Sequence, residues 1–119
     1  MNQGLPVFSQ VMTLIHPQQF ARCVARFPPP RALRSFSAWD HFLAMAFAQL
    51  TFRESLRDLE LCLRAQPHAL YRLGFRSQVT RISMAYANEH RDCRMFAALA
   101  EVLMRKARRL YADDPVMQA

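Results

Sequence analysis

Two helix starts, each followed by an apolar stripe, lie between Arg34 and Gln66, and they constrain the fold of this chain more than any other feature. Ser37 and Asp40 predict the first start, because the hydroxyl can accept a bond from an early N–H and the positive first turn favours a carboxylate. Thr51 and Glu54 form a capping box that predicts the second start. Each stripe has the spacing of one buried helix face. The first consists of Trp39, Phe42, Leu43, Ala46, Phe47 and Leu50, and the second of Phe52, Leu56, Leu59 and Leu63.

Helical periodicity continues through the rest of the chain, whereas sustained strand-like alternation is absent and only two glycines occur. Prolines, a glycine and further caps indicate where helices start and stop. In chain order these signals are Pro6, the His16–Pro17 cap, the stop at Pro28–Pro30, the start at Pro67, Gly74 as C′ residue, and Thr80 before a short helix from Arg81 to Ala87. The first helix is expected to face inward with Val7, Val11 and Leu14. The last, from about Arg91 to Tyr111, aligns Phe96, Leu99, Ala100, Leu103, Ala107 and Leu110.

These signals predict an all-α fold, a small bundle of five to six helices with a helix-turn-helix-like segment. The chain has 119 residues, of which 52% are apolar, and this is enough for one domain with its own core. We expect that domain to span residues 1–112. Residues 113–119 show no apolar pattern and are expected to form a disordered tail.

No group of residues predicts an active site, a metal site or a bound cofactor. The four histidines, at positions 16, 41, 68 and 90, do not stand at ligand spacing with one another, a cysteine or a carboxylate. Glycine-rich phosphate loops and nucleophile elbows are also missing from the sequence. Cys23, Cys62 and Cys93 form no CxxC pair, and all three are expected to be small buried side chains. The apolar runs are too short for a membrane span and no secretion signal is seen, so we expect a cytoplasmic, nucleoid-associated protein without membrane contact.

The charge of the chain indicates a polyanionic partner. Its formal net charge is +7, and its sixteen cations are fifteen arginines and one lysine. Guanidinium groups suit bidentate contacts to phosphate and guanine. The excess is largest in residues 76–112, where eight cations and three carboxylates give +5. An arginine-rich composition without any binding role is the alternative.

The same region has the spacing of a helix-turn-helix, although its loop is longer than the standard turn. In that geometry the first residues of the second helix, Arg81, Ser83 and Met84, would meet base edges. The preceding residues would contact phosphates, and these are Arg76, Ser77, Gln78 and Thr80. The remaining basic candidates for DNA contact are Arg91, Arg94, Arg105, Lys106, Arg108 and Arg109. A plain helical bundle with solvated arginines is the alternative.

Several stretches of the chain resemble one family of proteins. They are FSQVM, FARCVARF, RSFSAWDHFLAMAFAQLTFRESLRDLELCLRAQ, YRLGFRSQVTR and AYANEHRDCRMFA. Over about Asn2 to Leu110 the chain resembles the N-terminal domain of bacterial insertion-sequence transposases, the cut-and-paste class with a DDE, ribonuclease-H-like catalytic domain. The matching positions include Arg34, Ser35, Trp39, Asp40, Gln49, Leu50, Thr51, Arg53, Glu54, Ser55, Arg57, Asp58, Gly74, Arg76, Val79, Arg81, Ala87, Asn88, Glu89, Arg91 and Asp92. Cys93 replaces a frequent tryptophan, and Ile82-Ser83-Met84 replaces a more polar run, so base specificity does not transfer.

The resemblance implies a domain that recognises terminal inverted repeats in double-stranded DNA. The catalytic carboxylates of that class lie downstream of the point where this sequence stops, so we expect a truncated chain that is not an enzyme. An alternative role is a module that pairs transposase protomers, either with itself or with the full-length enzyme, or inhibits the enzyme. The apolar side chains of Phe8, Met12, Phe20 and Phe27 suggest this alternative.

Overall fold

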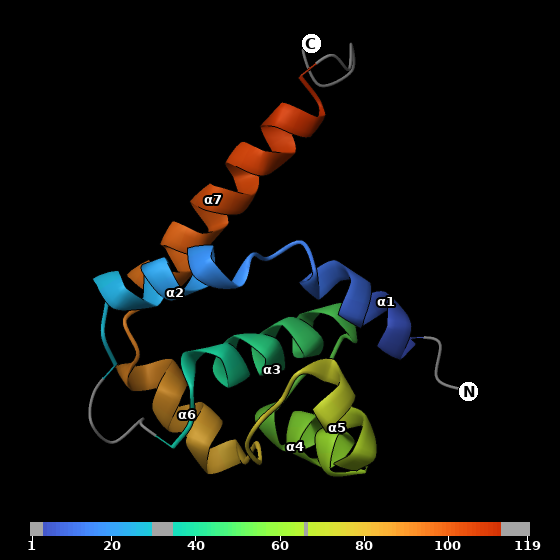
Figure 1. Ribbon diagram of the computed structural model, residues 1–119. Helices are drawn as coiled ribbons and strands as arrows, with labels where there is room; N and C mark the ends of the chain where they lie inside the picture. The colour runs from blue at the N-terminus through green and yellow to red at the C-terminus, as the bar shows by residue number, and fades with distance from the viewer. Residues whose placement is uncertain (1–3, 30–34, 66, 113–119) are drawn as a thin grey trace. The chain divides into compact units, whose positions relative to one another are not determined.

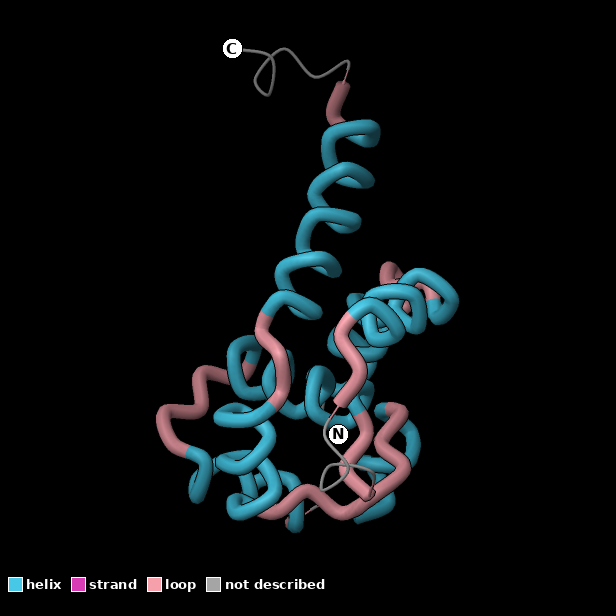
Figure 2. Tube along the Cα trace, turned by 90° about the vertical axis from the view of Figure 1, so that its left-hand side faces the viewer, coloured by secondary structure: helices cyan, strands magenta, loops and turns pink. Residues whose placement is uncertain are grey.

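The computed structural model describes residues 4–29, 35–65 and 67–112, and within them the chain forms seven helices and no strand (Figures 1 and 2). The all-α prediction is therefore confirmed. The helix number exceeds the expected five to six, and even the short segments at the chain start and after Pro67 form helices of their own. The helices are α1 (Gly4–Met12), α2 (Pro17–Arg26), α3 (Ala38–Leu50), α4 (Leu56–Arg64), α5 (Pro67–Leu73), α6 (Arg81–His90) and α7 (Arg94–Leu110).

The chain divides into two compact units, where the sequence predicted one domain over residues 1–112. The first unit contains α1 and α3 to α6, and the second contains α2 and α7. The second unit is therefore built from two segments that are far apart in the sequence. The expected tail, 113–119, and most of the proline-rich spacer before Phe36 lie outside the described residues.

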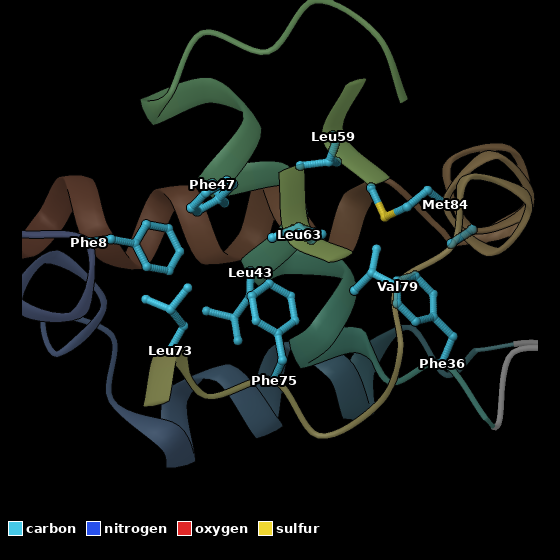
Figure 3. Close-up of a cluster of buried hydrophobic side chains, with 12 residues drawn as sticks. Phe8, Phe36, Leu43, Phe47, Leu59, Leu63, Leu73, Phe75, Val79 and Met84 are labelled. Carbon is cyan, nitrogen blue, oxygen red and sulfur yellow. The ribbon is translucent and has the colours of Figure 1, made fainter. Parts of the chain in front are cut away.

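The core of the first unit forms around α3, whose Leu43 and Ala44 are completely buried. Figure 3 shows side chains from α1, α4, α5 and α6 and from the loop before α6 converging on this helix. Phe8 of α1 meets Phe47 of α3 edge to face, with ring centroids 5.6 Å apart. Burial of each large apolar side chain contributes about 1.5–3 kcal/mol. The other members of the cluster are Phe36, Leu59, Leu63, Leu73, Phe75, Val79, Met84 and Ala87.

Most of the predicted helix ends are found at the expected residues. Ser37 caps α3 by accepting the Asp40 N–H at 3.0 Å, and His16 caps α2 through its Nδ1, with Pro17 in the first helical position. Thr80 caps α6, and Gly74 ends α5 with a φ of 104°, a conformation that favours glycine. Local side-chain chemistry was sufficient for these predictions.

The predicted capping box at Thr51 is wrong. Thr51 ends α3 instead, and its hydroxyl donates to the Phe47 carbonyl at 2.6 Å. Ser55 is the N-cap of α4, where its hydroxyl accepts the Asp58 N–H at 3.1 Å. Phe52, which we expected in the core, lies between the two helices with a φ of 60° and a side chain that is 87% exposed.

The apolar stripes were only partly right. Leu50, at the last turn of α3, and Leu14, beyond the end of α1, are more than half exposed. Among the described side chains of the first helix, Phe8 is buried and Val11 is exposed, and the side chain of Val7 lies outside the described part. Spacing defines a candidate face, but the contacts of α1 with α5 and of Phe8 with Phe47 decide which face is buried.

The second unit is a pair of helices that bury a small apolar interface. Phe20 and Cys23 are buried on α2, and Met95, Ala98 and Leu99 are buried on α7. The guanidinium of Arg94 also lies over the Phe27 ring, 4.8 Å from its centroid. The expected alignment along the last helix is wrong at three of its positions, because the side chains of Ala100, Ala107 and Leu110 are exposed.

Candidate nucleic-acid interface

The loop between α5 and α6 is anchored to α3 by a buried carboxylate. Asp40 is 1% exposed, and its oxygens accept the Arg76 N–H at 3.1 Å and the Ser77 hydroxyl at 2.5 Å. The Ser77 hydroxyl is therefore engaged within the fold, and a phosphate would have to compete with Asp40 for it. The sequence assigned Asp40 to the first turn of its helix but did not reveal this link to the loop.

The side chain of Arg76 lies against Tyr71 at the surface. Its guanidinium is 4.6 Å from the centroid of the Tyr71 ring, and it donates to the carbonyls of Phe75 at 3.1 Å and Tyr71 at 3.4 Å. Arg76, Tyr71 and the nearby Gln78 are all exposed, so their polar and aromatic surfaces are accessible to a ligand. Two of the four predicted phosphate-contacting residues, Arg76 and Gln78, thus project from the loop.

The first turn of α6 already has partners for several of its polar groups. The Thr80 hydroxyl accepts the Ser83 N–H at 3.0 Å and donates to the Ser83 Oγ at 2.9 Å. The Arg81 N–H donates to the Glu60 carboxylate at 2.6 Å. The side chain of Arg81 is exposed and remains a candidate for base contact. That of Met84 is 1% exposed and belongs to the core, so a base edge cannot reach it and Met84 is removed from the predicted contact set.

Arg91 is likewise a structural residue, contrary to its place among the predicted DNA contacts. It is 5% exposed, and its guanidinium donates to His41 Nδ1 at 3.0 Å and to the Phe36 carbonyl at 2.8 Å. Since His41 Nδ1 accepts this bond, the Nε2–H of the ring donates to Asn88 Oδ1 at 2.6 Å. Asn88 of α6 and Arg91, the C-cap of that helix, are in this way hydrogen-bonded to His41 of α3.

Burial sets the protonation of this network. Desolvation lowers the pKa of His41, and the nearby positive charge of Arg91 lowers it further, against the opposing effect of the Asn88 hydrogen bond. Burial also lowers the pKa of Arg91 from its very high ordinary value. A neutral His41 is what the geometry requires, because a protonated Nδ1 would present its hydrogen to a guanidinium donor.

In the second unit the predicted basic residues fall into two groups. Arg94 is engaged by Asp92 at 2.7 Å, which lowers the pKa of Asp92 and raises that of Arg94. Arg105, Arg108 and Arg109 of α7 are exposed, and Lys106 is half-buried. Arg94, at the start of α7, is thus paired within the fold, whereas Arg105, Arg108 and Arg109 have no ion-pair partner among the described residues.

Two of these α7 residues, Arg105 and Arg109, line a groove between α2 and α7. The groove has a volume of about 330 Å³. Its other lining residues are Gln19, Arg22, Cys23, Arg26 and Val102. The sequence placed Arg22 and Arg26 one turn apart on the same helix but gave no means of pairing that helix with α7, so both arginines were missing from the predicted site.

Residues 3–76 match the model of a domain family described as a domain of unknown function, DUF4372. The chain belongs to this family. DUF4372 occurs in transposase-related proteins. No curated protein and no solved structure matched the chain.

The DUF4372 match covers α1 to α5 and ends at Arg76, within the loop before α6. In this member of DUF4372, two features therefore include residues from outside the matched region. Asn88 and Arg91, in and after α6, bond to His41, and α7 lines one side of the basic groove. Within the described ranges no three His, Cys, Asp or Glu side chains are grouped for metal binding. None of the described helices has both the length and the apolar character needed to cross a bilayer.

Proposed function

We propose that this chain is a DNA-binding domain of an insertion-sequence transposase, which recognises the terminal inverted repeats of the element and is catalytically inert on its own. The observation that carries the proposal is the α5–loop–α6 segment. Arg76 and Gln78 are exposed on a loop that Asp40 holds in place, and Arg81 is exposed at a helix start whose N–H donates to Glu60. The membership in a family of transposase-related proteins and the net charge of +7 support it.

In this proposal the exposed residues have different tasks. Arg81, at the first turn of α6, contacts a base edge, and Arg76 and Gln78 contact the sugar-phosphate backbone. Ser83 is half-buried, and its N–H and Oγ are engaged by Thr80, so it has at most a supporting part. Met84 and Arg91 support the contact surface from within.

Selection from a randomised duplex library, followed by mobility shifts on the terminal repeats flanking the gene, tests the proposal. We expect an enriched motif that occurs in those repeats. Arg81→Ala should weaken binding to the enriched duplex by about 1–3 kcal/mol if it contacts guanine, while Arg57→Ala, an exposed change on α4, should leave that preference intact. A library that shows no enrichment after selection would refute sequence recognition.

The second candidate function is protomer pairing or inhibition of the full enzyme. Phe8 and Phe20, which suggested it, are buried within the two units and leave no surface for a partner. The exposed apolar side chains of Met104, Leu110 and Tyr111 on and after the end of α7 favour it instead. Sedimentation at high micromolar concentration should then reveal a dimer that Leu110→Asp abolishes, and a monomer would rule pairing out.

A further inference from the structure

The groove between α2 and α7 has an uneven charge distribution. Four of its seven lining side chains are arginines, and none is a carboxylate. Arg22, Arg26, Arg105 and Arg109 have no carboxylate partner among the described residues, whereas Arg53, Arg64 and Arg94 each have one. The groove therefore collects positive charge that no described carboxylate neutralises through an ion pair.

The two helices present this charge in the same way. On α2, Gln19, Arg22 and Arg26 follow one another at spacings of three and four residues, and so lie along one face. Val102, Arg105 and Arg109 repeat the spacing on α7. The two arginines of each helix stand in the i, i+4 relation, where like charges destabilise an isolated helix. An anion in the groove would relieve this repulsion on both helices together.

The floor and the donors of the groove suit a phosphodiester. Cys23 is 4% exposed and Val102 is half-buried, so the floor is apolar and the polar atoms come from the arginines and the Gln19 amide. Guanidinium groups bind phosphate oxygens in pairs and remain charged at all physiological pH values. Four of them carry more charge than one phosphate group neutralises, which favours an extended chain of phosphates over a single small anion.

We propose that the α2–α7 groove binds the sugar-phosphate backbone of duplex DNA, as a contact that does not depend on base sequence. This inference rests on the proposed DNA-binding function and adds a second contact region, in the other unit, to the one around α6. It assigns Arg22 and Arg26 of α2 a binding role, together with Arg105 and Arg109 of α7.

Fluorescence anisotropy with a labelled random-sequence duplex at several salt concentrations tests the inference. R22Q/R26Q and R105Q/R109Q each remove two charges and keep good helix formers. Since each neutralised phosphate contributes a slope of about 0.9 in log K against log salt, we expect each variant to lose about 1.8 in slope and to bind about 60-fold more weakly at 0.1 M salt. Thermal melts followed by circular dichroism establish that the variants are folded.

The matched control is R57Q/R72Q, which removes two exposed arginines of the first unit and the same net charge. If the control weakens binding and flattens the salt slope as much as the groove variants do, general charge is responsible and the inference is overturned. Groove variants that keep the wild-type affinity for DNA but lose binding to vesicles containing phosphatidylserine would overturn it in favour of a membrane surface.

The failure of the two proposals can be told apart. The effect of the groove variants on the random duplex, compared with that of R57Q/R72Q, reports on the groove, and the enrichment of a motif reports on base recognition by α6. Groove variants that weaken binding to the random duplex, in a protein that enriches no motif, would uphold the groove and refute sequence recognition. If the protein enriches a motif and the groove variants bind the random duplex as tightly as wild type, sequence recognition is upheld and the groove is refuted.

Discussion

Replacing the buried Arg91 should destabilise the first unit by a large fraction of its stability. Arg91→Met fills much of the same volume but removes both donors, so His41 Nδ1 and the Phe36 carbonyl lose partners at 3.0 and 2.8 Å. A hydrogen bond to a charged group contributes about 1.5–3 kcal/mol, so the loss of two should cost about 3–6 kcal/mol. Domains of this size are commonly stable by about 5–15 kcal/mol, so the loss is a substantial part of the total and would unfold the unit at the lower end of that range.

Urea unfolding followed by circular dichroism measures this change. Arg91→Lys keeps the charge but has no planar fork, so it should reach one acceptor and lose less stability than Arg91→Met. Arg57→Met, an exposed change on α4, should stay within about 0.5 kcal/mol of wild type. If Arg91→Met unfolds at the same urea concentration and with the same slope as wild type, and only DNA binding suffers, Arg91 is a ligand contact and the structural role is refuted.

Three further predictions concern protonation, a turn and a cap. The pKa of His41 is lowered in the folded state, so the unfolded chain binds the extra proton first, and the free energy of unfolding should fall as pH drops below about 6.5. Urea midpoints between pH 7.5 and 5 should show this loss, and His41→Gln should reduce it. Gly74→Ala should lower the free energy of unfolding by about 1–2 kcal/mol in thermal melts, because alanine is strained at a φ of 104°. A steric clash does not contribute, since the added Cβ would lie 3.5 Å from Leu43 and Trp39, an ordinary contact distance. Ser55→Ala should cost about 1 kcal/mol, and an equal or larger loss in Glu54→Ala than in Ser55→Ala would restore the Thr51 capping box.

The sequence predicted those features of the fold that depend on neighbouring residues. Ser37, Thr80 and Gly74 mark helix ends because their side chains, or the lack of one, act within a single turn. Burial depends on distant partners and was predicted less well. Leu50 and Phe52 have the right spacing for the core, but α3 ends at Leu50 and Phe52 follows it in the loop, so both side chains are exposed.

The cysteines illustrate the same limit. All three were expected to be buried, but only Cys23 is. Cys62 of α4 packs against the core of the first unit yet stays partly exposed, and Cys93 is exposed at the start of α7. Local composition gives the average behaviour of a residue type, whereas its position in the packed helices decides the individual case.

The candidate site depends still more on contacts between distant residues. Arg91 and Arg81 look alike in the sequence, and only the packing of α6 against its neighbours makes one a core residue and the other a surface residue. Arg22 and Arg109 belong to helices at opposite ends of the chain, so no spacing rule could join them in one groove. Charge counting identified the region of α7 but not its partner.

The division of the second unit between two distant segments has a consequence for the order in which the chain folds. During synthesis α2 leaves the ribosome early, and it cannot bury Phe20 and Cys23 against α7 until every helix of the first unit has emerged. Closing so long a loop is slow compared with forming local helix contacts. The nascent chain therefore carries an uncovered apolar helix until α7 has emerged, and the basic groove is completed only then.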